Sequence, residues 1–442
     1  MFKESRKSII IIITVILAVF LVSCGSNKNG KETANSDGVL ELEFFYPVNV
    51  GGPATQIVDQ MVAEFEEENP NIKINPVYTG NYDDTFTKIQ TAVQGGTPPD
   101  LFISLATHRF TMEDLGIVEP LDDFIKGDED GQKYIEDFLP SFMEDSYVDG
   151  NIVSIPFQRS TMVLYYNKDL FTEAGLDPDS PPKNWDELVE YSQKLTSDDH
   201  VGVGLALNSG SAQWSFGGFA MQNSKNGENL MSEDGKEVYF DTPENVEALQ
   251  LWIDLQNKYE SMNKGIVQWT DLPAQFLAQE VAMIYHTTGN MENINENAEF
   301  EFGAAFLPGN KRIAAPTGGG NFYISSDISD ERKEAAWKFI RFATSTEQAA
   351  NWSLKTGYVP TRQSAIDSDE MQKYYTDIPQ AKVAYEQLEF AKPELTTYDA
   401  AQVWRIFNDG IQSAITGEKT AEEALKDAQK DADLILERYQ GK

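Results

Sequence analysis

Apolar and polar positions at the start of the folded part alternate first with the period of a strand and then with that of a helix. Residues 39–46 alternate one by one and predict a strand with one buried face. From Ile57 to Phe65 the apolar residues recur at spacings of three and four, which predicts an amphipathic helix. Asn69-Pro70 follows, and because proline cannot continue a helix, the helix is expected to end there.

The same alternation continues directly after this helix. A strand that contains Ile72 and Ile74 is predicted, and then a helix with Phe86, Ile89 and Val93 on one side. After the break at Gly95-Gly96, a third strand is predicted at 101–103. Strands that alternate with helices predict an α/β fold, a mostly parallel sheet with helices on its faces. Ligands bind such sheets at the carboxyl ends of strands, so the loop from Ser104 to His108 is a candidate site.

Three later helices are marked by their first residues. Thr242-Pro243 places a proline in the first turn of one helix, and Asp330 begins another. Thr420-Ala421-Glu422-Glu423 has the form of a capping box. The buried face of this last helix is expected to carry Leu425, Ala428, Ala432 and Ile435.

The amino terminus has the pattern of an export signal. Basic residues lie between Lys3 and Lys7, and Ile9 to Val22 form an apolar run that is short for a membrane span, which needs about 20 residues. The run ends at Leu21-Val22-Ser23-Cys24, which resembles the lipobox at which bacterial lipoproteins are cut and acylated. We therefore expect residues 1–23 to be a signal peptide and Cys24 to be the lipid attachment point. A short membrane anchor with an incidental cysteine is the alternative.

The composition of the chain excludes several classes of binding partner. Residues 24–37 hold mainly Gly, Ser, Asn and Lys and predict a lipidated, disordered tether. The chain has 35 Lys+Arg against 71 Asp+Glu, a formal net charge of −36 at pH 7. Nucleic acid and anionic membrane surfaces are therefore excluded as partners, and membrane contact is expected through the lipid alone. One cysteine also excludes an intramolecular disulfide.

The length of the rest of the chain predicts more than one core. It exceeds the usual size of a single domain, and no internal repeat, heptad run or flexible Gly/Ser linker interrupts it. Two lobes joined by structured crossings are expected.

Six motifs along the chain carry a family resemblance. They are TGNYDD from Thr79, GGTPPDLF from Gly95, YYNKDLFTEAGLDP from Tyr165, the triple glycine Gly318–Gly320, KTGYVPT from Lys355 and TGEKTAEEALKDA from Thr416. Each is weak alone, but six in one order make the chain similar to the carbohydrate-type solute-binding proteins of ABC importers. The resemblance is nearest to members that bind glycerol 3-phosphate and more distant to members that bind maltose.

The resemblance implies a two-lobed fold of periplasmic-binding-protein type, which closes over a solute in the cleft between the lobes. The implied crossings lie near 156–161, 316–320 and 358–361. The implied limits are 38–155 and about 317–358 for lobe 1, and about 160–315 and 360–442 for lobe 2, with some C-terminal exchange between lobes.

The resemblance also carries ligand contacts onto this chain. The implied contacts are Tyr82, Ser160, Thr287, Gly319, Tyr358 and Trp404, with Trp214 of the loop 213–216 as a further platform. Aromatic rings suit stacking on a sugar, hydroxyls donate and accept hydrogen bonds, and glycine lets backbone amides approach a ligand. Each contact also has a purely structural alternative. Tyr82 would be a loop tyrosine that covers a helix, Ser160 a solvated linker serine and Thr287 a helix N-cap. The glycines would relieve crowding in a crossing strand, and a tryptophan would fill the core.

Two departures from the glycerol-3-phosphate-binding members bear on the solute. Leu105 stands where those members have a ligand-binding glutamate, and Trp404 falls at their phosphate-binding arginine. Arg159 and Arg405 are the available cations, and a buried phosphate needs a cation or several N–H donors. If both arginines face solvent or acidic neighbours, a neutral sugar is the better expectation.

The implied function is that of a monomeric, lipid-anchored substrate-binding protein without a cofactor. It would pass a sugar or polyol phosphate to the permease subunits of an ABC importer, on the extracytoplasmic face of the cell membrane. The long tether favours a bacterium with a single membrane.

Two other classes stay open. A polysaccharide hydrolase needs a pair of carboxyl groups, and no motif singles out a pair among the many acids. The histidines His108, His200 and His286 lie beside no Gly-x-Ser-x-Gly turn, and the sequence has no HExxH, paired CxxC or Walker loop, so no enzymatic, metal or nucleotide site is expected. A carbohydrate-binding adhesin or sensor is not separated from an importer component by the sequence.

Overall fold

The computed structural model describes residues 38–48, 53–208 and 210–441. The predicted signal peptide, the Cys24 attachment point and the tether lie outside these residues. No helix in the described part of the chain is long and apolar enough to cross a membrane.

The alternation at the start of the chain folds as predicted. It forms β1 (Leu40–Tyr46), α2 (Ala54–Glu68), β2 (Ile72–Tyr78), α3 (Tyr82–Gln94) and β3 (Leu101–Leu105). β1 pairs in parallel with both β2 and β3. α2 ends directly before Asn69-Pro70 and buries the apolar stripe from Ile57 to Phe65.

The whole sheet is mixed, which corrects the prediction of a mostly parallel one. The other strands are β6 (Ile155–Asn167), β7 (Val201–Gly204), β8 (Val281–Thr287), β9 (Phe302–Ala305), β10 (Ala315–Ile324) and β11 (Ala391–Lys392), with β4 (Tyr147–Val148) and β5 (Asn151–Ile152) in a separate pair. The order is β2-β1-β3-β10-β6-β8-β7, with β9 also on β6 and β11 also on β10. β10 is antiparallel to β3 and β6, and β6 is antiparallel to β8.

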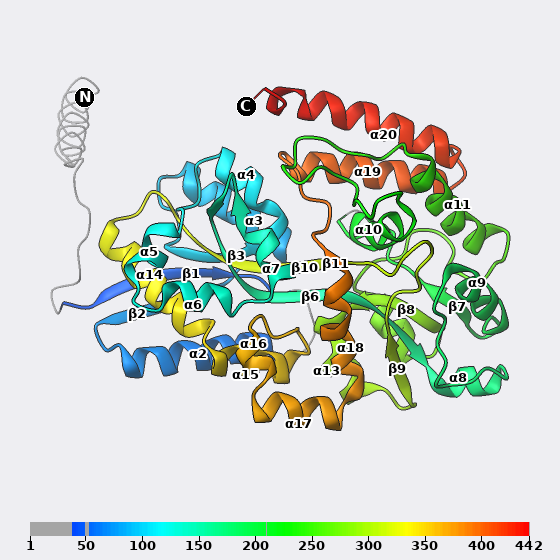
Figure 1. The fold of residues 1–442 in the computed structure, drawn as a ribbon, viewed down its shortest axis with the longest axis horizontal. Helices are drawn as coiled ribbons and strands as arrows, with labels where there is room; N and C mark the ends of the chain where they lie inside the picture. Colours follow the sequence, from blue (N-terminus) through cyan, green and yellow to red (C-terminus); the bar gives the residue numbers. More distant parts are fainter. Residues whose placement is uncertain (1–37, 49–52, 209, 442) are drawn as a thin grey trace, which may run out of the picture.

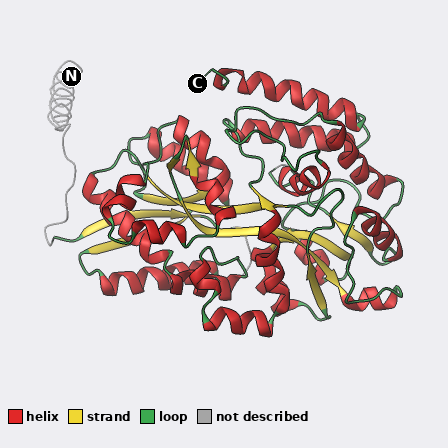
Figure 2. Ribbon diagram, viewed as in Figure 1, coloured by secondary structure: helices red, strands yellow, loops and turns green. Residues whose placement is uncertain are grey.

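Helices cover both faces of these strands (Figure 2). They are α4 (Arg109–Asp114), α5 (Asp122–Gly127), α6 (Gly131–Glu136), α7 (Pro140–Met143), α8 (Lys168–Glu173), α9 (Trp185–Lys194), α10 (Ala212–Asn223), α11 (Pro243–Asn257), α12 (Leu272–Leu277), α13 (Met291–Asn297), α14 (Asp330–Ala343), α15 (Thr346–Thr356), α16 (Gln363–Ile366), α17 (Asp369–Asp377), α18 (Pro379–Gln387), α19 (Ala400–Ile415) and α20 (Ala421–Leu436).

The long strands β6 and β10 join two halves of the molecule (Figure 1). Their pairing places Gly318 opposite Ser160 and Gly319 opposite Arg159, and the register shifts between Gly320 and Asn321. The backbone N–H of Val359 donates to the carbonyl of Arg159 at 3.0 Å. The three expected crossings therefore lie side by side.

Each half has its own apolar packing. One core includes Leu42, Phe65 and Phe339 around β1 and α14, and the other includes Trp252 and Ile284 around β8 and α11. The second core also includes Phe102 of β3 and Phe110 of α4, in the first half. The lobe limits given above remain a prediction.

The helix starts predicted later in the chain are confirmed, and the buried face of the last helix is corrected at one position. Thr242 caps α11, and Thr420 forms the capping box of α20 with Glu423. Ile435 is only half-buried, and the adjacent Leu436 takes the buried position instead.

Candidate ligand-binding site

A cavity of about 220 Å³ lies where β6 and β10 meet the ends of β3 and β8. Its lining residues are Asn81, Tyr82, Asp83, Leu105, Ser160, Asn208, Gly210, Ser211, Gln213, Trp214, Gln268, Trp269, Thr270, Thr287, Gly319, Tyr358, Glu394 and Trp404. They come from both halves of the molecule, so the cavity lies between the lobes.

Most residues implied by the family resemblance meet at this cavity. Those that line it are Tyr82, Ser160, Trp214, Thr287, Gly319, Tyr358 and Trp404. They belong to α3, β6, α10, β8, β10, the segment after α15, and α19. Trp214 lies on α10, which corrects its prediction as a loop residue.

Of the expected loop from Ser104 to His108, only Leu105 lines the cavity. Ser104 is still part of β3, and 106–108 form a buried 3₁₀ turn. The prediction that this segment is a loop was wrong, because β3 runs on to Leu105 and the chain then turns through 106–108 directly into α4.

Tyr82 and Tyr358 form one wall. Tyr82 is the first residue of α3, directly after the N-cap Asn81. Its hydroxyl donates to Oε1 of Gln158 at 2.8 Å and is also hydrogen-bonded to the Tyr358 side chain. Burial raises the pKa of Tyr82 and raises that of Tyr358 to about 12. Both phenols are therefore neutral hydroxyls at physiological pH.

Three tryptophans also line the cavity. The indole N–H of Trp214 donates to the carbonyl of Thr317 at 3.1 Å, and that of Trp404 donates to the carbonyl of Leu395 at 2.8 Å. Trp269 lies 5.2 Å from Trp214 between ring centroids. Since the backbone occupies two of the indole N–H groups, those rings offer a solute their faces and edges. Such surfaces suit the C–H faces of a sugar.

The triple glycine brings β10 close to these rings. A Cβ on Gly318 would lie 2.5 Å from Cζ2 of Trp214. Gly319 has a φ of +97°, and a Cβ there would lie 1.9 Å from the carbonyl oxygen of Gln158. Glycine is thus required at Gly318 by the tryptophan and at Gly319 by the backbone itself.

Two hydroxyls complete the polar lining that the resemblance implies. The Ser160 hydroxyl has no hydrogen-bond partner among the described residues. Thr287 caps the 3₁₀ turn at 288–290, and its Oγ1 accepts from the Gly289 N–H at 3.1 Å. Its proton therefore remains available to donate, so the capping role and a cavity-facing hydroxyl are both present.

The two arginines considered for a phosphate lie elsewhere. Arg159 is fully buried, and its Nη2 donates to Oδ2 of Asp145 at 2.5 Å. Arg405 is exposed and lines a neighbouring cavity that shares Trp404 with the first. Within the described ranges, no lysine, arginine or histidine lines the candidate site.

The sequence analysis missed Trp269, Asp83 and Glu394. Trp269 stacks on His286 with 3.8 Å between ring centroids. Glu394 is 5% exposed, and burial, followed by the Asp145 charge, raises its pKa to about 8 while Arg159 opposes the rise. Asp83 lies in the motif TGNYDD, directly after Tyr82, so that motif could have indicated it. Trp269 and Glu394 lie outside the helices and strands, and the one sequence feature of Glu394 is an acid between Pro393 and the apolar Leu395.

The buried histidines support rings rather than act as bases. Burial lowers the pKa of His108 and of His286 to about 3, so both are neutral. His108 lies 5.8 Å from the Trp404 ring. The described residues contain no group of three or more His, Cys, Asp or Glu side chains that would hold a metal ion.

Comparison with known proteins identifies the family. The family model described as bacterial extracellular solute-binding protein matches residues 60–379. The chain belongs to this family. The sn-glycerol-3-phosphate-binding periplasmic protein UgpB of Escherichia coli K12 is 29% identical to this solute-binding protein over 430 residues, which cover 92% of this chain and 94% of UgpB.

Solved structures agree with the family. UgpB of Mycobacterium tuberculosis in complex with glycerophosphocholine is 26% identical, with a TM-score of 0.80, and the match covers 91% of this chain and 100% of that one. Maltose-bound MalE3 of T. maritima has the same fold at 23% identity, with a TM-score of 0.77 and coverage of 90% and 100%.

These similarities confirm the predicted family and the two-lobed α/β fold. They place the solute-binding protein outside the cytoplasm, among the binding components of sugar or glycerol-phosphate ABC importers. These relatives are binding proteins rather than enzymes, which agrees with the absence of an expected catalytic motif.

Proposed function

We propose that this protein is a lipid-anchored receptor that captures a hydroxyl-rich solute, a neutral sugar rather than a phosphate ester, and delivers it to an ABC permease. The observation that carries the proposal is the composition of the cavity. Aromatic rings and neutral hydroxyls converge on it from both lobes, and no described cation lines it.

Charge favours the sugar over the ester. A phosphate dianion removed from water without a cation or aligned donors loses many kcal/mol of hydration free energy. Arg159 is engaged by Asp145, and Arg405 is exposed, so neither supplies the missing charge at the cavity. A polyol phosphate remains the alternative, because the relative from Mycobacterium tuberculosis was crystallised with glycerophosphocholine.

Closure of the lobes over the solute would form the state that the permease recognises. The crossings at β6, β10 and 358–361 lie together, and a few residues in such crossings are enough to absorb a hinge motion.

A lipid on Cys24 would keep the receptor at high effective concentration beside its permease. Replacement Cys24→Ser is expected to abolish acylation and to release the protein from the membrane fraction. Labelling with a radioactive fatty acid and membrane fractionation test this. Unchanged labelling of the variant would contradict the anchor.

The solute is tested by a thermal-shift screen. Both hydrophobic cores lie between Leu40 and Tyr439, so a protein without its first 24 residues retains them. The panel contains neutral mono- to tetrasaccharides, glycerol 3-phosphate and its diesters. A solute at a hundred times its dissociation constant stabilises the folded state by about 2.7 kcal/mol.

A rise with a saccharide supports the proposal, and a rise with phosphate esters alone contradicts the neutral solute. Deletion of the gene with unchanged uptake of the bound saccharide would favour an adhesin or sensor over an importer component. Hydrolysis of an oligosaccharide by the pure protein would contradict a binding role.

A further inference from the structure

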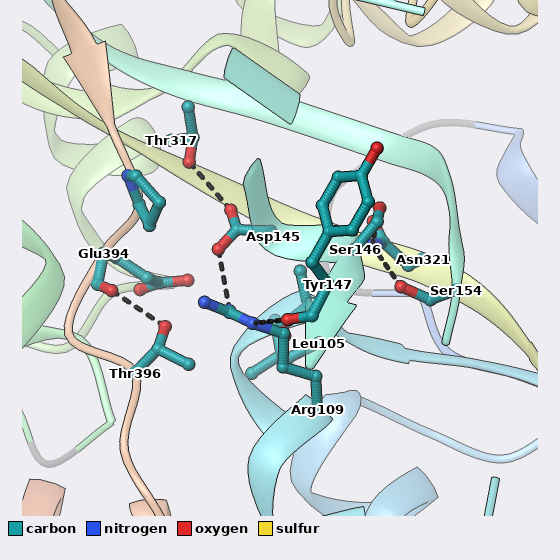
Figure 3. Close-up of polar contacts among 12 residues, drawn as sticks. Leu105, Arg109, Asp145, Ser146, Tyr147, Ser154, Thr317, Asn321, Glu394 and Thr396 are labelled. Carbon is teal, nitrogen blue, oxygen red and sulfur yellow. Dashed lines mark hydrogen bonds and ion pairs between the residues drawn. The ribbon is translucent and has the colours of Figure 1, made fainter. Parts of the chain in front are cut away.

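A cluster of buried charges surrounds Asp145 (Figure 3). Asp145 bridges two arginines: Nη1 of Arg109 lies 2.9 Å from its Oδ1, and Nη2 of Arg159 lies 2.5 Å from its Oδ2. Thr317 also donates its hydroxyl to Oδ2 of Asp145 at 3.0 Å. Both carboxylate oxygens of Asp145 are therefore occupied.

Glu394 is the fourth member of this cluster and the one that reaches the cavity. It lines the cavity and is 5% exposed, and its side chain extends toward Asp145 (Figure 3). In the described structure its carboxyl group has no hydrogen bond or ion pair, whereas its backbone carbonyl accepts from Thr396 Oγ1 at 2.8 Å. A buried carboxyl group without a partner is unfavourable unless a ligand or the balance of nearby charge compensates for it.

The charges of the cluster balance when Glu394 is ionised. Two arginines then face two carboxylates, and no positive charge is left for an anionic solute. A phosphate entering the cavity would instead meet the carboxylate of Glu394 directly. A sugar hydroxyl, in contrast, donates a hydrogen bond to a carboxylate and gains from its charge.

We propose that Glu394 is the specificity-determining residue of the cavity: its carboxyl group hydrogen-bonds a hydroxyl of an uncharged solute and, in its ionised form, excludes phosphate esters. The inference rests on the proposed function and names the residue that makes the distinction. Without Glu394, the arginine pair would present an excess positive charge beside the solute.

The exclusion should depend on pH. The charged or titratable groups that act on Glu394 are Asp145, Arg159 and Tyr82, with Arg109 bound to Asp145. Arginine stays protonated, and the pKa of Tyr82 is raised by burial, so neither changes charge between pH 7 and 9.5. Glu394, with its pKa of about 8, does. A phosphomonoester is already a dianion in this range, since its second pKa is about 6.

The test compares the parent protein with Glu394→Gln at pH 7 and pH 9.5 by isothermal titration calorimetry. The probes are glycerol 3-phosphate and the saccharide that gives the largest thermal shift. The matched control is Glu389→Gln, which removes the same charge from an exposed residue outside the cavity.

At pH 9.5, Glu394→Gln is expected to bind glycerol 3-phosphate at least about tenfold more tightly than the parent and the saccharide about three- to tenfold more weakly. At pH 7 the two proteins should differ less than about threefold for the phosphate ester, because most Glu394 is protonated there. Glu389→Gln should match the parent throughout. Opposite changes for two solutes cannot come from misfolding.

The failures are distinguishable. If the parent binds a saccharide but Glu394→Gln gains no phosphate affinity, the inference is wrong and the proposed function stands. If the parent prefers glycerol 3-phosphate at pH 9.5, the inference is wrong, and the neutral-sugar part of the proposed function is contradicted with it. If the parent binds neither class of solute, the proposed function fails and the inference fails with it.

Discussion

The carboxyl group of Glu394 ties the stability of the protein to pH. Its pKa rises from the ordinary 4.5 to about 8 on folding. Between these values the folded state holds a proton that the unfolded state has lost, so stability falls as pH rises through this window. Below pH 4.5 the penalty is absent, and above pH 8 it is complete.

Glu394→Gln removes this penalty because an amide does not ionise. We expect the variant to unfold at a higher urea concentration than the parent at pH 9, and at the same concentration near pH 4.5. Urea denaturation followed by circular dichroism measures both midpoints. Glu389→Gln should follow the parent at each pH, and a constant difference between Glu394→Gln and the parent would contradict the assignment.

Asp145 forms ion pairs with two buried arginines, so its replacement should lower the free energy of unfolding more than replacement of the adjacent Glu144. In Asp145→Asn, Arg109 and Arg159 lose their shared carboxylate inside the protein, and we expect a loss of about 3–5 kcal/mol in unfolding free energy. Glu144→Gln breaks an exposed pair with Lys392 and should change stability by less than about 1 kcal/mol. Chemical denaturation measures the unfolding free energy of both variants. Equal losses in the two variants would contradict the bridging role of Asp145.

At the residue scale, the sequence predicts the site as far as the family motifs reach. Tyr82, Thr287 and Trp404 lie in or align with such motifs, and they line one cavity. Arg159, considered only as an available cation, directly precedes Ser160, and alternation along β6 turns its side chain to Asp145 instead. Glu394 has no periodic context, because the segment after β11 is neither helix nor strand. Its place depends on the packing of β11 against β10.

At the element scale, β10 approaches α10 so closely that a methyl group changes the site. A Cβ on Gly318 would lie 2.5 Å from the Trp214 ring, and Trp214 also donates to the carbonyl of Thr317 on the same strand. Gly318→Ala should therefore displace Trp214 and weaken solute binding about two- to tenfold, an effect typical of a lost stacking surface.

Gly127→Ala is the control for this substitution, because a Cβ on Gly127 meets no atom within 4 Å. It should leave solute affinity unchanged. Calorimetry with the saccharide found in the screen measures both variants. An unchanged affinity in Gly318→Ala would show that Trp214 does not contact the solute.

The same scale shows why the parallel part of the sheet was predictable and the rest was not. β1 to β3 are bounded by local signals such as Asn69-Pro70 and Gly95-Gly96. β10, however, enters beside β3 from far along the chain and pairs Ile324 with Leu101 in the opposite direction. No local sequence pattern indicates that β10 pairs with β3. The sequence therefore predicts a mostly parallel sheet, whereas the sheet is mixed.

At the scale of the whole molecule, the lobes touch at a second place besides the crossings. Phe110 of α4 stacks on Tyr398 at 5.2 Å, and Tyr398 stacks on Tyr439 at 4.4 Å between ring centroids. These tyrosines flank α19 and α20, which pack on α11 in the other half. Opening of the cleft would have to separate these rings.

Phe110→Ala should therefore favour the open form and weaken solute binding about three- to tenfold, although Phe110 does not line the cavity. Phe124→Ala is the control, since Phe124 packs against Trp337 within the first half, with 6.0 Å between ring centroids. Both variants should lose stability, and only Phe110→Ala should lose affinity and gain a larger radius of gyration in solution scattering. Equal affinities would mean that the contact persists when the cleft opens.

The tryptophans of the cavity have a consequence beyond recognition. Three of the seven tryptophans in the chain line the cavity: Trp214, Trp269 and Trp404. The rings of Trp214 and Trp269 are in contact, with 5.2 Å between their centroids. Indole emission responds to the polarity around the ring, so a solute that displaces water there would alter a large share of the intrinsic fluorescence. Solute binding would therefore be measurable from the intrinsic tryptophan fluorescence of the protein, without an added dye.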